Sequence, residues 1–192
     1  MAKGQEQAAP DAVLTRIGQV VMLHHAGDRE EARHRFLGLW AEIGEHGDPL
    51  HRCTLAHYLA DTQDDPEDEL AWDLRALSAA QELARELAED RPADRHEGAL
   101  AARALYPSLH LNLAADYERL GHREAARLHL RRARGAAESL ARDRYGEGVR
   151  AAIGRLELRL GGAGPDGSGG AGGPGGSGGP VGPWGPPRQQ RP

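Results

Sequence analysis

The chain has 192 residues, a formal net charge of −5 at pH 7, one cysteine, and aromatic side chains at 4% of its positions. This length suits one ordinary domain, and the negative charge argues against generic affinity for nucleic acid. A single cysteine excludes an internal disulfide, and a body rich in Ala, Leu, Arg and Glu favours helices over a sheet. We therefore predict an all-α protein.

Residues 1–10 are polar and contain no apolar run of the kind that a secretory signal needs, so we expect a disordered lead-in. The longest aliphatic run, 20–23, is far too short to span a membrane. We accordingly expect a cytoplasmic protein that does not bind a membrane.

Apolar residues recur at helical spacing in two segments near the start of the chain, 11–26 and 29–45, and Gly27-Asp28 separates them. The inward positions of the first segment are Val13, Ile17, Val20, Val21 and Leu23. Those of the second are Ala32, Phe36, Leu39, Trp40 and Ile43. The two segments predict a helical hairpin.

Two Asp-Pro pairs, Asp48-Pro49 and Asp65-Pro66, predict the starts of the next two helices. The aspartate can accept hydrogen bonds from free backbone N–H groups, and proline suits the first helical position. The first of these helices is expected to end near residue 62, and the second to run over 66–89. The inward leucines of the longer helix are predicted to be Leu70, Leu74, Leu77, Leu83 and Leu87.

The remaining sequence predicts a loop over 90–95, a helical stretch over 97–106, and then Pro107, which either kinks the chain or begins a new helix. A third hairpin is expected over 107–120 and 123–141, and a last helix over 147–160 is expected to cap the end of the stack. More than half of the glycines and prolines lie in 161–192, which is predicted to be a disordered tail. A proline-rich patch around Trp184 is a candidate docking motif within it.

Two of these hairpins carry small and aromatic residues at characteristic positions. Leu113-Ala114-x-x-Tyr117, Gly121 and Ala126-x-x-x-Leu130 resemble the helix-turn-helix unit of tetratricopeptide repeats, and Ala32-x-x-x-Phe36 has the same spacing. The resemblance implies that residues 11–160 form a right-handed α-solenoid of about three hairpins plus a C-terminal capping helix. The repeat is irregular, and 90–106 could be a fourth, degenerate unit.

In tetratricopeptide proteins the first helix of each hairpin lines a concave groove that binds a protein segment. The resemblance therefore implies a non-catalytic interaction scaffold with no metal and no cofactor. Groove positions carried over from the family are Ile17, Val21, His24, His25, Cys53, His57, Asp61, Leu111, Asn112, Ala115, Glu118 and Arg119.

The family's clamp for C-terminal carboxylates consists of lysine, arginine and asparagine. Only Asn112 and Arg119 match it here, whereas His57 and Asp61 stand where cations or asparagine would be needed. We therefore expect a basic or neutral partner segment and not an acidic tail.

Two other function classes remain open from the sequence. Cys53, His57 and Asp61 follow one another at intervals of four residues, so they share a helix face and could serve a small metal-dependent enzyme. A nucleic-acid-associated helical repeat, or a sensor partner of a transcription regulator, is the other class, although the net charge makes nucleic acid the less expected ligand. Its candidate phosphate contacts are a stripe of arginines, Arg123, Arg127, Arg131 and Arg134.

Overall fold

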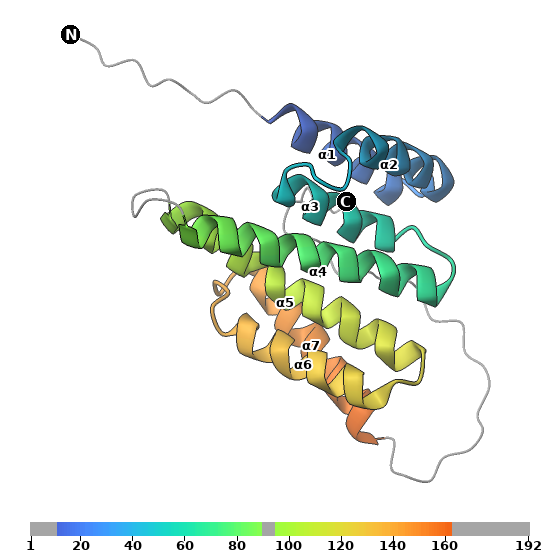
Figure 1. Ribbon diagram of the computed structural model, residues 1–192. Coiled ribbons are helices and arrows are strands. Elements are labelled where there is room, and N and C mark those ends of the chain that lie inside the picture. The colour runs from blue at the N-terminus through green and yellow to red at the C-terminus, as the bar shows by residue number, and fades with distance from the viewer. Residues whose placement is uncertain (1–10, 90–94, 163–192) are drawn as a thin grey trace, which may run out of the picture.

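A computed structural model describes residues 11–89 and 95–162, and in this part of the chain every regular element is a helix (Figure 1). The predicted all-α class is confirmed. The helices are α1 (Ala12–His25), α2 (Arg29–Ile43), α3 (Pro49–Ala60), α4 (Pro66–Glu89), α5 (Arg95–Arg119), α6 (Arg123–Ala137) and α7 (Arg144–Gly162). The predicted lead-in, the loop over 90–94 and the tail from 163, with its Trp184 patch, lie outside the described residues.

The helices follow one another as antiparallel hairpins, α1 with α2, α3 with α4, and α5 with α6 (Figure 1). Each hairpin packs against the next, through α2 with α3 and α4 with α5, and α7 lies against α6 and α5 at the end of the series. No helix of the described residues is long and apolar enough to cross a membrane.

Local sequence signals set the helix starts and turns as predicted. Asp48 Oδ1 accepts hydrogen bonds from the backbone N–H groups of Leu50 (2.8 Å) and His51 (3.1 Å), and Pro49 occupies the first turn of α3. The turn between α5 and α6 contains Gly121 at φ 78°, a conformation that side chains with a Cβ rarely adopt. These residues therefore end one helix and start the next at the expected places.

The predicted start of a new helix at Pro107 was wrong, because α5 is one continuous helix with Pro107 inside it. Proline removes a backbone hydrogen bond and crowds the preceding turn, at a cost of about 3 kcal/mol. Pro107 is buried, α4 and α6 both pack along α5, and the Ser108 hydroxyl donates a hydrogen bond to the Leu105 carbonyl (2.9 Å). Packing of this kind outweighs a local breaker, so 97–106 is the first half of α5 and not a separate unit.

Three neighbouring apolar clusters form the core. The first joins α1, α2 and α3 around Phe36, which is fully buried and stacks on Tyr58. The second joins α3, α4 and α5 around Ala56, Ala76 and Leu109. The third joins α5, α6 and α7, and α7 contributes Val149, Ile153, Leu156 and Leu160 to it. The core therefore continues from hairpin to hairpin along the chain.

Leu74 departs from the predicted inward face of α4, because its side chain is 41% exposed. The preceding residues explain the difference. Trp72 lies edge-on to Trp40 of α2, with ring centroids 5.0 Å apart, and Asp73 is fully buried. The face of α4 that turns inward is therefore set by an aromatic residue and a carboxylate at positions that a count of leucines does not identify.

Candidate functional site

Four of the expected groove residues are core residues in the structure. Ile17 and Val21 belong to the first apolar cluster, Cys53 to the second and Leu111 to the third, and each is at most 5% exposed. Their side chains pack between helices and present no surface to a partner. The tetratricopeptide resemblance placed these four residues on the floor of a groove, but in this chain they pack in the core between helices.

Four other expected groove residues lie in two separate pairs, one at the end of α1 and one on α5. His24 and His25 end α1, with ring centroids 5.8 Å apart, and burial lowers the pKa of His24. Ala115 packs against the third apolar cluster. Glu118 accepts hydrogen bonds from Arg159 of α7, at 2.8 Å from Nη2 and 3.0 Å from Nε. These residues do not form a common site.

The last four, His57, Asp61, Asn112 and Arg119, are brought to one place, where α3, α4 and α5 meet. The centre of that place is a set of three carboxylates that the sequence analysis missed. We call Glu69, Asp73 and Asp116 the acidic cluster, and one oxygen of each lies within 4.8 Å of one oxygen of each of the others.

The helices determine why these three carboxylates meet. Glu69 and Asp73 are four residues apart on α4 and therefore share a face. Asp116 lies on α5, which packs along α4. Asp73 is fully buried and Asp116 is 1% exposed, whereas the Glu69 side chain is 20% exposed. The cluster thus lies between two helices, with one edge at the surface.

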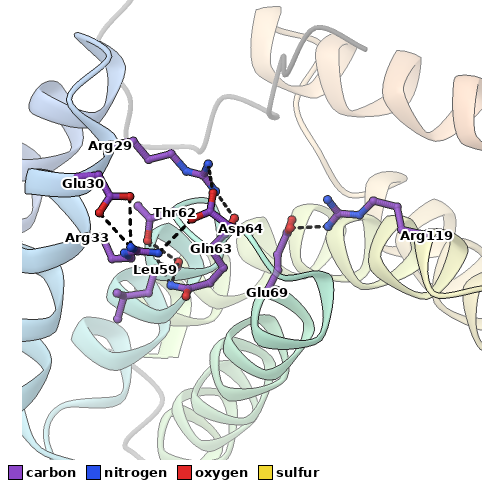
Figure 2. A network of polar contacts seen from close by, with 9 residues as sticks. All are labelled: Arg29, Glu30, Arg33, Leu59, Thr62, Gln63, Asp64, Glu69 and Arg119. Carbon is purple, nitrogen blue, oxygen red and sulfur yellow. Dashed lines mark hydrogen bonds and ion pairs between the residues drawn. The ribbon is translucent and has the colours of Figure 1, made fainter. Parts of the chain in front are cut away.

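Arg119 neutralises part of the acidic cluster. Its Nη2 atom lies 2.5 Å from Glu69 Oε2 and 2.7 Å from Asp116 Oδ1, and Figure 2 shows it reaching from α5 to Glu69 on α4. Asp116 Oδ2 and both carboxylate oxygens of Asp73 are buried without a hydrogen-bond partner. The His57 ring lies beside Asp73, and its Nδ1 is 3.7 Å from Asp73 Oδ1 and 3.4 Å from Asn112 Nδ2.

The electrostatics of the site follow from burial and from like charges. Burial, with Asp73 and Glu69 nearby, raises the pKa of Asp116 well above its usual range despite Arg119. Burial also raises the pKa of Asp61 to about 6, although the neighbouring His57 opposes the shift. For His57, burial lowers the pKa, but the adjacent Asp73 carboxylate and the charge of Asp61 more than offset it, so the net direction is upward. The site therefore favours bound cations and protons.

The turn before the cluster is tied to the first hairpin (Figure 2). Asp64 accepts from Arg29 of α2 at 2.6 Å and from Arg33 at 3.3 Å, and Arg29 also donates to the Gln63 carbonyl. The Thr62 hydroxyl donates to the Leu59 carbonyl at 2.7 Å. These contacts fix the chain between α3 and α4, and with it the orientation of the first turn of α4.

Cys53 is not part of this site. Its thiol is buried in the second apolar cluster, beside a cavity of about 10 Å³ that His57, Tyr58 and Leu109 also line. Burial raises the pKa of Cys53 to about 12, and Asp73 adds to the shift. A cysteine reacts as a nucleophile or binds a metal as the thiolate. Because burial disfavours the thiolate of Cys53, we expect this cysteine to be inert at neutral pH.

The missed carboxylates did carry a sequence signal. Asp73 follows Trp72 and precedes Leu74, and Asp116 lies between Ala115 and Tyr117, so each acidic residue interrupts the apolar pattern of its helix. A buried polar residue at a core position is more informative than a charge in an acidic run. The two aspartates lie more than 40 residues apart in sequence, and nothing in their local patterns indicates that they meet.

No family model matches the chain, and neither the curated proteins nor the solved structures contain a match. The tetratricopeptide resemblance therefore remains a prediction from the quoted positions.

Proposed function

We propose that this chain is a non-catalytic scaffold, a right-handed solenoid of tetratricopeptide-like hairpins, that binds a basic segment of a partner protein. The stacking of sequential hairpins supports the repeat assignment. So does the complete burial of Ala32, Ala56, Ala114 and Ala126, because small residues at helix contacts are typical of these repeats. The inert thiol of Cys53 supports a role without covalent catalysis.

One surface feature carries the proposal. Four exposed carboxylates follow one another at the turn before α4 and in its first turn, and we call them the acidic rim: Asp64, Asp65, Glu67 and Asp68. Among the described residues, only Asp64 of the rim takes part in an ion pair. Asp65 also accepts a hydrogen bond from the Glu67 backbone N–H at 2.7 Å.

The acidic rim is suited to bind a positively charged partner. The Asp64 side chain is held by Arg29 and Arg33, and Arg29 also holds the adjacent Gln63 carbonyl, so this end of the rim is presented without a large ordering cost. Exposed charges of one sign steer an oppositely charged partner and determine which partner is accepted. A segment rich in lysine or arginine is therefore the expected ligand.

The test is an affinity capture from the native lysate with three forms of the full chain. These are the wild type, the rim variant Glu67→Lys/Asp68→Lys, and the control variant Glu138→Lys/Glu147→Lys, which makes the same charge change at exposed positions just after α6 and in α7. Glu147 lies in the first turn of α7, so its substitution reproduces the helix-dipole effect of one of the two rim substitutions.

We expect a partner that the wild type and the control retain and the rim variant loses, with binding that weakens as salt rises. A partner that all three forms retain equally would contradict the acidic rim as the binding surface. If the wild type captures no partner, the scaffold proposal itself is contradicted.

A further inference from the structure

We propose that the acidic cluster of Glu69, Asp73 and Asp116 binds one divalent cation of the hard, oxygen-preferring class, such as Mg²⁺, Mn²⁺ or Ca²⁺. This site is separate from the acidic rim, and it neither requires nor excludes a protein partner. It supplies ligands from α4 and α5, the two helices that join the second hairpin to the third.

The spacing of the oxygens suits a single ion. Three atoms that all lie within 4.8 Å of one another have a common centre no more than about 2.8 Å from each, compared with about 2.0–2.6 Å for Mg²⁺–O and Ca²⁺–O bonds. Side-chain movements of a few tenths of an ångström would bring the carboxylates to bonding distance. No helix has to shift.

A second observation points to a ligand independently of this spacing. Asp73 is fully buried, one of its oxygens belongs to the cluster, and neither oxygen has a hydrogen-bond partner, since even the nearby His57 Nδ1 lies 3.7 Å from Oδ1. Asp116 Oδ2 is likewise buried and without a partner. Buried polar groups almost always find partners, because an ionised carboxylate without one is strongly unfavourable. A cation bound by the cluster would give a partner to the oxygen of Asp73 that belongs to it.

The charges around the site agree with a divalent ion. Arg119 contacts Glu69 and Asp116, so the cluster and this arginine together carry a formal charge of −2 when all three carboxylates are ionised. His57 and Asp61, which interact with each other beside the cluster, add one charge of each sign when both are ionised. A divalent cation would therefore bring the group to neutrality.

The residue types and the position of the site define the class of ion and its route of entry. The three carboxylates offer only oxygen, which favours Mg²⁺, Mn²⁺ or Ca²⁺ over zinc or copper. The Glu69 side chain is one-fifth exposed and that of Arg119 nearly half exposed, so this edge of the cluster meets the solvent. In Figure 2, Arg119 and Glu69 form a bridge between α5 and α4 at this edge.

The experiment titrates the chelator-treated full chain with Mn²⁺, following free Mn²⁺ by electron paramagnetic resonance, and then competes with Mg²⁺ and Ca²⁺. The variants are Asp73→Asn and Asp116→Asn. The matched control is Asp68→Asn, which removes an exposed carboxylate next to Glu69. We expect one equivalent of Mn²⁺ on the wild type and on the control, and an affinity at least about tenfold lower in both cluster variants.

Thermal melting separates loss of the site from loss of the fold. In cation-free buffer Asp116→Asn should stay close to the wild type in stability, because the amide keeps an oxygen that can accept from Arg119 and removes the repulsion from Asp73 and Glu69. Added cation should raise the melting temperature of the wild type more than that of the cluster variants. If an aspartate variant does not fold, Glu69→Gln at the partly exposed edge provides the same comparison.

Two results would overturn the proposal. One is the absence of stoichiometric binding up to about 1 mM cation, the weak end of protein calcium sites. The other is a cation effect on Asp73→Asn as large as that on the wild type. Either result would leave a proton shared among the buried carboxyls as the explanation of the cluster.

Discussion

His110 of α5 and His129 of α6 form a buried pair in which at least one ring must be neutral. Their Nδ1 atoms lie 3.1 Å apart, so one nitrogen donates its proton and the other accepts it. Burial, followed by His129 and Arg132, lowers the pKa of His110 to about 4, and burial with Arg132 lowers that of His129. We expect His110→Gln to reduce the loss of stability in acid, because the unfolded histidine gains a proton near pH 6.5 and the folded one does not.

The sign and the size of this effect can be measured. Stability should fall as the pH drops below about 6.5 and level off near 4, with a contribution from His110 of about 1–3 kcal/mol. Urea unfolding at pH 7 and pH 4.5 checks it, with His34→Gln as the control because His34 is exposed on α2. Equal acid losses in the wild type and in His110→Gln would contradict the neutral state of His110.

Cys53 gives a second prediction at the level of a single residue. Its thiol is buried between α3, α4 and α5, and its pKa is raised to about 12. We therefore expect almost no reaction with a thiol-specific disulfide reagent at pH 8 in the folded chain, and a rate close to that of free cysteine in concentrated urea. Fast reaction of the folded chain would show that the second apolar cluster opens readily.

At the scale of the residue, the sequence identified some neighbours of the acidic cluster but not its buried aspartates. It selected His57 and Asp61 because they share a helix face, and Asn112 and Arg119 by analogy with a family clamp, and all four lie beside the acidic cluster. It did not select Asp73 or Asp116. Their meeting depends on how α4 packs along α5, which is a tertiary property that neither local pattern contains.

At the level of the helix, two aspartates at helix starts provide a matched comparison. Asp48 accepts hydrogen bonds from two backbone N–H groups at the start of α3, whereas Asp28 precedes α2 without a side-chain cap hydrogen bond. We expect Asp48→Ala to lower the free energy of unfolding by about 1 kcal/mol and Asp28→Ala to lower it by clearly less. Urea unfolding of both variants tests this, and equal losses would contradict the capping geometry.

The same local signals explain how well helix boundaries could be predicted. Asp-Pro and glycine act through the backbone within one turn, so the starts of α3 and α4 and the turn at Gly121 were predicted correctly. The same local rule gave a wrong helix start at Pro107, because α5 continues through it and packs on both sides against its neighbours. Local chemistry thus fixes the ends of these helices, and packing decides whether a helix continues through a proline.

At the level of the whole molecule, the three apolar clusters follow one another along the series of hairpins. The first cluster lies in α1–α3 and the third in α5–α7, and they have no residue in common. In a repeat array each unit is stabilised by its immediate neighbours, so the destabilisation caused by a substitution at one end should decrease with distance along the array. In a single cooperative domain the same substitution would destabilise all helices equally.

Leu156→Ala distinguishes these two behaviours. Leu156 of α7 is buried in the third cluster, so its loss should lower stability by about 2–5 kcal/mol, whereas Leu158→Ala should change little because Leu158 is 77% exposed. Hydrogen exchange should speed up in the described parts of α5, α6 and α7 and remain near the wild-type rate in α1 and α2. The reason is that α7 packs mainly on the last hairpin, and the apolar contacts of the first cluster are made by α1, α2 and α3. Equal acceleration in all seven helices would show that the hairpins unfold as one unit, and would remove the main physical argument for a repeat architecture.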